Sequence, residues 1–227
     1  MMETYYIVVI LMIAIPIIAQ INISANFNKY KKISVKNKLS GFEAARGILD
    51  ANGLSNIHIV EVRGHLSDHY DPRRKVIRLS TDIFHGETIA AVAVASHEVG
   101  HAIQDKEGYT FMRIRSMIVP VVNITSYVGY ILIVISMLLS AMNMFWLAIG
   151  LMAFSIVFQV ITLPVEYNAS SKAEEQVQKL NLVDLDEVNG VKKMLGAAAL
   201  TYVASLLTQM LQIVRLVMVM NGRSNRR

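Results

Sequence analysis

Two histidines and a glutamate stand together in the run Ser96-His97-Glu98-Val99-Gly100-His101, which matches the pattern H-E-x-x-H. On a helix, residues four apart share one face at about 6 Å, so His97 and His101 can bind the same zinc ion. Glu98 is turned by about 100° from His97, which lets its carboxylate reach a water molecule at the metal. The motif therefore predicts one Zn²⁺ per chain, with His97 and His101 as ligands and Glu98 as general base.

A catalytic zinc site needs a third protein ligand, and two glutamates are candidates. Glu107 stands where the longer pattern H-E-x-x-H-x-x-G-x-x-H places that ligand, but Gln104 occupies the position of the glycine. Glu166 stands at the start of a second predicted helix and would complete a set of two histidines and one glutamate. We prefer Glu166, because without the glycine the chain has no easy turn before Glu107.

Polar segments before the motif predict a small domain that mixes helices and strands. Residues 40–52 predict an amphipathic helix with Ser40 as its N-cap, and residues 87–106 predict the helix that carries the motif. Residues 57–62 and 75–80 predict strands, and we expect 75–80 to be an edge strand that pairs with an extended peptide. Three side chains are candidate donors of a hydrogen bond to a developing oxyanion: His69, Tyr70 and Tyr167.

Composition places the rest of the chain in a membrane. Of the 227 residues, 54% are hydrophobic and 17% are charged, whereas soluble domains have about 25% charged residues. Three apolar runs are long enough to cross a bilayer, namely residues 5–23, 117–139 and 144–165. A fourth run, residues 197–220, is also long enough but contains the polar residues Gln209, Gln212 and Arg215. The sequence therefore predicts three or four transmembrane helices.

Basic residues orient these helices. A lysine cluster follows the first span directly, and the positive-inside rule then predicts a cytoplasmic location for the polar domain and an external N-terminus. The cluster consists of Lys29, Lys31, Lys32, Lys36 and Lys38. With this orientation a fourth crossing would place Arg223, Arg226 and Arg227 outside, against the rule. The sequence therefore does not decide whether residues 197–220 cross the membrane.

Several runs of the sequence together resemble a known family. They are Asp68-His69-Tyr70-Asp71-Pro72, the strand of residues 75–80, the motif at 97–101, and Pro164-Val165-Glu166-Tyr167-Asn168-Ala169-Ser170. These runs resemble the bacterial YugP-like family of neutral zinc membrane metallopeptidases over nearly the whole chain. The chain is more distantly similar to gluzincins of the HtpX and CAAX prenyl protease type, in which a membrane hairpin also separates the motif from the third ligand.

The resemblance implies a function and a set of site residues. It implies His97, His101 and Glu166 as zinc ligands and Glu98 as catalytic acid and base. Because Glu166 directly follows the third predicted span, we expect the zinc near the cytoplasmic face of the bacterial plasma membrane and a peptide or membrane-protein segment as substrate. The distant group often has an aspartate four residues after the ligand glutamate, where this chain has Ser170. Asn168 is a candidate substitute for that support of a ligand histidine.

These observations predict a mainly α integral membrane protein with a small α+β zincin-like catalytic domain. In order, we expect an anchor (1–23), the zincin-like domain (24–116), a transmembrane hairpin (117–165), a third-ligand helix (166–196) and a hydrophobic helix with a basic tail (197–227). Cysteine is absent, which excludes a disulfide-stapled domain and thiolate metal sites. No nucleic-acid motif accompanies the lysines, so we expect lipid and peptide as partners and no nucleic acid. The sequence leaves the oligomeric state open.

One different class of function remains. A membrane scaffold with a structural zinc would need the same ligands, because ligands show metal binding and not turnover. Intramembrane proteolysis and metal transport are less favoured, because the motif does not lie in a span and the spans contain almost no ligands.

Overall fold

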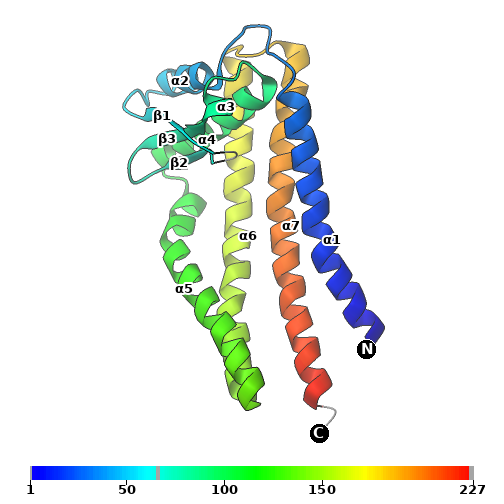
Figure 1. Cartoon of the computed structure of the whole chain (residues 1–227). Coiled ribbons are helices and arrows are strands. Elements are labelled where there is room, and N and C mark those ends of the chain that lie inside the picture. The colour runs from blue at the N-terminus through cyan, green and yellow to red at the C-terminus, as the bar shows by residue number, and fades with distance from the viewer. Residues whose placement is uncertain (1, 65–66, 225–227) are drawn as a thin grey trace. The chain divides into compact units, whose positions relative to one another are not determined.

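The computed structural model describes residues 2–64 and 67–224, and the chain is mainly helical (Figure 1). Arg226 and Arg227 of the predicted basic tail lie outside the described residues. The elements are α1 (Met2–Tyr30), α2 (Gly41–Ala51), β1 (His58–Val62), β2 (His69–Asp71), β3 (Val76–Ser80), α3 (Thr81–Phe84), α4 (Ile89–Glu107), α5 (Thr110–Leu139), α6 (Met142–Lys179) and α7 (Leu185–Ser224).

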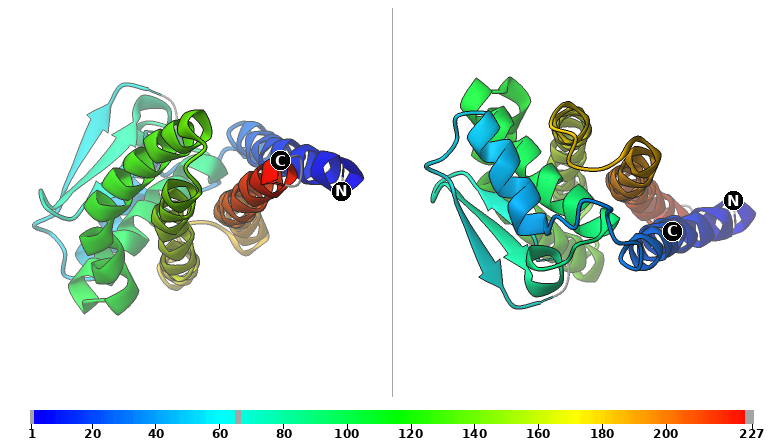
Figure 2. Two further views of the ribbon diagram at one scale, coloured as in Figure 1. Left: turned by 90° about the horizontal axis from the view of Figure 1, so that it is seen from below. Right: turned by 90° about the horizontal axis from the view of Figure 1, so that it is seen from above.

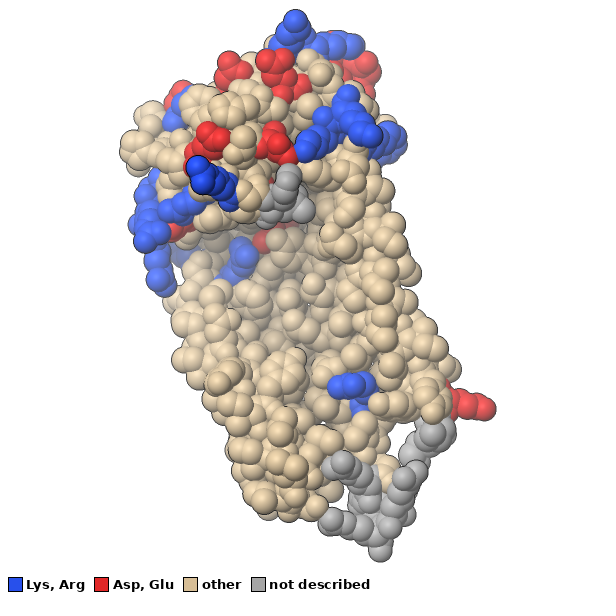
Figure 3. All heavy atoms as spheres, in the orientation of Figure 1, with Lys and Arg blue, Asp and Glu red and all other residues tan. Residues whose placement is uncertain are grey.

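Four of these helices are long and apolar enough to cross a membrane, namely α1, α5, α6 and α7. Their apolar parts form one of two compact units, which comprises Met1–Gln20, Arg113–Leu163 and Thr201–Arg227. On the face shown in Figure 3, these helices carry almost no charged side chains. The predicted class, a mainly α protein of membrane type with a small sheet, is confirmed.

Helix α6 differs from the prediction. We expected one helix to end near residue 165 and a new one to begin at Glu166, but α6 runs without a break from Met142 to Lys179 and contains Pro164. A proline removes one backbone hydrogen bond, and helices of membrane proteins tolerate this loss when neighbouring groups compensate. Glu166 therefore lies inside a long helix rather than at the start of one.

The second unit comprises Ile21–Met112 and Pro164–Leu200 and contains a three-stranded sheet in the order β1-β3-β2. Strand β3 pairs in parallel with β1 and antiparallel with β2. The prediction that residues 75–80 form an edge strand is therefore wrong, because β3 is the central strand. Strand β2 was not predicted, since its three residues are too few to show an alternating pattern.

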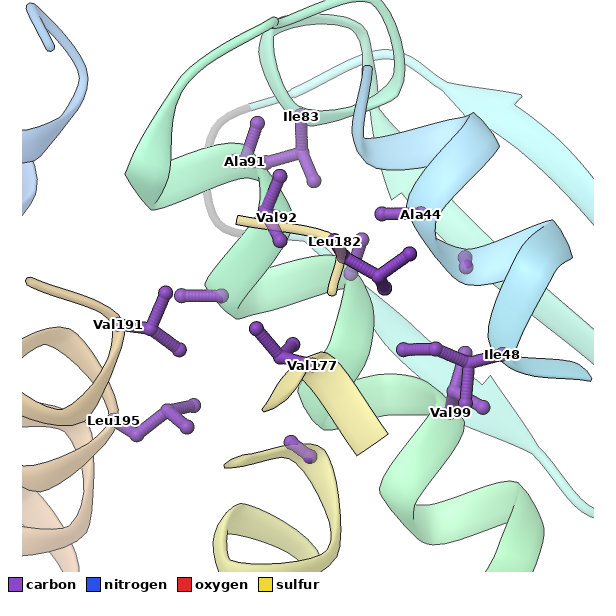
Figure 4. Close-up of a cluster of buried hydrophobic side chains, with 14 of the residues drawn as sticks. Ala44, Ile48, Ile83, Ala91, Val92, Val99, Val177, Leu182, Val191 and Leu195 are labelled. Carbon is purple, nitrogen blue, oxygen red and sulfur yellow. The ribbon is translucent and has the colours of Figure 1, made fainter. Parts of the chain in front are cut away.

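Helices α2 and α4 contact the strands of this unit and each other (Figure 2). Ser40 caps α2 as predicted: its hydroxyl accepts from Glu43 N, and the Glu43 carboxylate accepts from Ser40 N at 2.8 Å. The core of the unit is made mostly of small and branched side chains from its helices and strands, and Figure 4 shows part of it, with labelled residues that include Ile48, Val99, Val177 and Leu195. The helix that carries the motif is thus fixed by packing along its buried faces.

Candidate metal centre

Helix α4 presents both histidines of the motif on one face. Thr88 caps the start of α4 by accepting from Ala91 N, and Gly108 follows its end in the left-handed conformation with φ of 67°. Between these caps the helix is regular, so the rings of His97 and His101 lie one turn apart with centroids separated by 4.8 Å.

Glu166 on α6 meets both rings. Its Oε2 atom lies 3.2 Å from Nε2 of His97 and 3.5 Å from Nε2 of His101. One potential ligand atom from each of the three residues lies within 4.8 Å of the other two. Glu166 is almost fully buried, with 1% of its surface exposed. The structure therefore brings together the three residues that the sequence argument preferred as ligands.

This arrangement fits zinc. Ligands at about 2.0–2.1 Å from a tetrahedral ion lie roughly 3.3 Å from one another, which agrees with the observed separations of 3.2 and 3.5 Å. Two imidazole nitrogens and one carboxylate oxygen are also the donor types that zinc takes in hydrolytic sites. Among the described residues, this cluster offers three ligands, whereas a closed structural zinc site has four.

Glu107, the other candidate for third ligand, lies elsewhere. Helix α4 continues through Gln104 and ends at Glu107, so the turn that the longer pattern requires is absent. The Glu107 carboxylate is half exposed and forms an ion pair with Lys172 at 2.7 Å.

A glycine lets the two ligand-bearing helices approach. A Cβ atom placed on Gly100 would lie 2.3 Å from the carbonyl oxygen of Ala169, far closer than van der Waals contact. Gly100 is the neighbour of His101, and Ala169 lies one turn after Glu166. The close packing of α4 on α6 thus occurs at the level of the three candidate ligands.

Both histidines have a partner for the second ring nitrogen. The Ser170 hydroxyl lies 3.2 Å from Nδ1 of His97, and the Gln104 amide oxygen lies 3.0 Å from Nδ1 of His101. Burial alone lowers the pKa of His101, but the hydrogen bond from its ring to the Glu166 carboxylate and the nearby charges outweigh burial, so the pKa of His101 is raised. Ser170, which stands where the distant group has an aspartate, thus contacts a candidate ligand histidine itself.

Glu98 is buried next to the ligand histidines and is held by the sheet. Its Oε2 accepts a hydrogen bond from the backbone N–H of Tyr70 in β2 at 2.9 Å. Glu98 is not one of the three clustered ligands, which agrees with a role other than metal binding.

Two of the three candidate oxyanion donors, Tyr70 and His69, have other contacts, and the third, Tyr167, is half exposed. The Tyr70 hydroxyl donates to Asp105 at 2.7 Å, and burial together with this hydrogen bond raises the pKa of Tyr70. His69 is exposed, with Nδ1 2.8 Å from the carbonyl oxygen of Ser67. Tyr167 is 50% exposed on α6. A role for any of them in stabilising an oxyanion stays a prediction.

Two residues at the site were not recognised from the sequence. Gln104 was considered only as the residue in place of a glycine, although its position three residues after His101 puts it on the same helix face. Gly100 was given no role, although a glycine inside a helix is costly and often marks a close approach. Asn168 contacts Gln104 at 2.9 Å rather than a ligand histidine.

The chain is similar to known proteins over nearly its whole length. Residues 5–221 match the model of a family described as "Putative neutral zinc metallopeptidase". The chain is 47% identical over 206 residues to "Putative membrane protease YugP" of Bacillus subtilis (strain 168), an alignment that covers 90% of this chain and 92% of the relative. No solved structure matches. A match over nearly the full length, together with four apolar helices and a zinc-type ligand cluster, shows that the chain belongs to this family of neutral zinc metallopeptidases.

Proposed function

We propose that the chain is a zinc metalloendopeptidase that holds one Zn²⁺ through His97, His101 and Glu166. The observation that carries this proposal is the convergence of three donor atoms from two helices beside a further buried carboxylate, that of Glu98. A structural zinc would need the three ligands but would have no use for that carboxylate. Membership of the zinc metallopeptidase family supports the same reading.

The residues of the chain divide the chemistry between them. Zinc, when bound, supplies Lewis-acid chemistry that polarises a peptide carbonyl and makes water more acidic. Glu98 accepts the proton of the attacking water and then donates it to the leaving amine. The Tyr70 N–H fixes Oε2 of Glu98, so we assign the proton to the other carboxylate oxygen. His97 and His101 are held by Ser170 and Gln104 in the orientation needed for binding.

We further propose that the site works at the cytoplasmic face of the bacterial plasma membrane. The lysine cluster between Lys29 and Lys38 supports a cytoplasmic location and an external N-terminus. Glu166 follows the apolar stretch of α6 in the sequence, which supports a site near the membrane surface. Peptides and cytoplasmic segments of membrane proteins are then the proposed substrates.

The test compares Glu98→Gln with the wild-type protein, both purified in detergent. We expect Glu98→Gln to keep one zinc per chain and to lose at least about 100-fold of the rate of casein cleavage, because only proton transfer is removed. Zinc content is measured by elemental analysis, and a chelator should abolish wild-type cleavage. Unchanged cleavage in Glu98→Gln would contradict the proposal, and a wild-type protein that binds zinc but cleaves nothing would favour the scaffold.

A further inference from the structure

A buried glutamine connects one ligand histidine to the backbone of the other ligand-bearing helix. Gln104 is fully buried and forms three hydrogen bonds with its amide. Its oxygen lies 3.0 Å from Nδ1 of His101, and its nitrogen lies 2.7 Å from the carbonyl oxygen of Val165 and 2.9 Å from Oδ1 of Asn168. All the hydrogen-bonding atoms of this amide therefore face named partners.

The Val165 carbonyl fixes which way the Gln104 amide points. A backbone carbonyl can only accept a hydrogen bond, so the atom of Gln104 that faces it must be the NH₂ group. The atom that faces His101 must then be the amide oxygen, which also can only accept. Nδ1 of His101 must therefore carry a hydrogen atom.

The consequence concerns the other nitrogen of the ring. In a neutral imidazole with its proton on Nδ1, Nε2 has a free lone pair. Nε2 faces the carboxylate oxygen of Glu166 at 3.5 Å, and because the carboxylate can only accept, either a proton or a metal ion must lie between these two atoms. In the metal-free protein a proton on Nε2 makes this contact, and a bound metal ion takes the place of that proton. We propose that Gln104 is a positioning residue, which holds His101 as the Nδ1–H tautomer so that Nε2 is free to bind the metal.

The other histidine lacks this constraint. Ser170 is the partner of Nδ1 of His97, and a hydroxyl can either donate or accept, so it does not select a tautomer. Of the two partners, only Gln104 therefore selects the tautomer of the histidine that it contacts. The inference rests on the proposed function, because it takes His101 to be a zinc ligand.

The experiment measures zinc affinity by competition with a chromophoric chelator, and the melting temperature of the metal-free protein. Gln104→Met keeps the length of the side chain and removes all three hydrogen bonds, so we expect zinc to bind about 10–100-fold more weakly. Gln104→Glu keeps an acceptor for Nδ1 of His101 but cannot donate to Val165. We expect it to melt at a lower temperature and to bind zinc nearly as well as the wild type.

A second buried glutamine provides a matched control. Gln176 lies further along α6, is 7% exposed and accepts a hydrogen bond from Asn52 at 2.9 Å. Gln176→Met should lower the melting temperature and leave zinc affinity unchanged. A purely structural role for Gln104 would instead make Gln104→Met behave like Gln176→Met.

The outcomes separate this inference from the proposed function. If Glu166→Ala loses zinc while Gln104→Met binds it as tightly as the wild type, only the role of Gln104 is wrong. If the wild type binds no zinc, or if Glu166→Ala keeps it, the proposed metal site is wrong and the inference fails with it. Should Gln104→Met not fold, nitrogen NMR of histidine-labelled wild type with zinc decides: a proton on Nε2 of His101 would overturn the proposal.

Discussion

The carboxylate of Glu166 is buried in a helix that is otherwise largely apolar. An unpaired charge in such a place is strongly unfavourable, and a group of this kind persists when it is paired or binds a metal. In the metal-free protein His97 and His101 provide the pairing. The same three residues therefore stabilise the fold and form the proposed metal site.

The first prediction separates the two candidates for third ligand. Glu166→Ala should lose bound zinc, whereas Glu107→Ala should keep it and lose only an exposed ion pair with Lys172, which contributes about 0–1 kcal/mol. Zinc per chain after dialysis is the measurement. Loss of zinc in Glu107→Ala together with normal zinc in Glu166→Ala would reverse the choice.

A second prediction concerns pH. The pKa of His101 is raised in the folded protein, so its pairing with Glu166 stabilises the metal-free fold at acid pH and this stabilisation is lost as pH rises through the folded value. Zinc needs the deprotonated ring, so stabilisation by zinc should grow over the same range. Melting temperatures with zinc and with chelator, from about pH 6 to pH 9, test both trends around the ordinary histidine value. Parallel curves would contradict the prediction.

For single residues, the sequence could predict the proposed ligands but not the residues that form hydrogen bonds with the two histidines. The spacing of His97 and His101 is a property of one helix and can be read locally. The contacts of Gln104 with Val165 and of Ser170 with His97 join residues more than sixty positions apart, so they depend on how α4 packs on α6. No local pattern contains that information.

Between elements, the packing of α4 on α6 depends on the absence of a side chain at Gly100. The carbonyl oxygen of Ala169 occupies the space that a Cβ atom would need. This carbonyl belongs to backbone, which cannot turn aside as a flexible side chain does. The distance between the histidines and Glu166 is therefore set by backbone contact.

The third prediction tests that contact. Gly100→Ala should push the helices apart, cost about 1–3 kcal/mol of stability and weaken zinc binding. The matched control is Gly47→Ala in α2, where a Cβ atom would meet nothing within 4 Å. That change should be neutral or stabilising by up to about 1 kcal/mol. Thermal unfolding and zinc titration of both variants provide the measurements, and equal behaviour of the two would refute the role of Gly100.

The elements show where local reasoning succeeds. The α2 cap at Ser40 and the strands near residues 58–62 and 76–80 follow from patterns within a few residues. The position of β3 at the centre of the sheet does not, because it depends on β2, whose pairing is set by tertiary contacts. The helix start expected at Glu166 is likewise absent, because α6 continues through Pro164.

Over the whole molecule, the proposed topology depends on the lysines that follow α1 and on the four helices that are long and apolar enough to cross a membrane. With an external N-terminus, four crossings also place the C-terminus outside. The three arginines near the C-terminus would then lie outside, against the positive-inside rule. We therefore assign the orientation from the larger group of lysines that follows α1.

The absence of cysteine makes this topology directly testable. In intact cells, a thiol introduced by Lys32→Cys should be protected from a membrane-impermeant reagent, and one introduced by Thr4→Cys should be labelled. Both positions are exposed at opposite ends of the α1 region. Labelling of Lys32→Cys without lysis would reverse the proposed orientation.

The proposed ligands His97 and Glu166 are 69 residues apart, and α5 and the apolar part of α6 lie between them in the chain. A ribosome therefore completes the histidine pair long before the glutamate that joins it. During that interval the nascent chain holds two ligands and an unfinished hairpin that must enter the bilayer. The proposed metal centre can therefore be completed only after the chain between its two helices, including the predicted hairpin, has been synthesised.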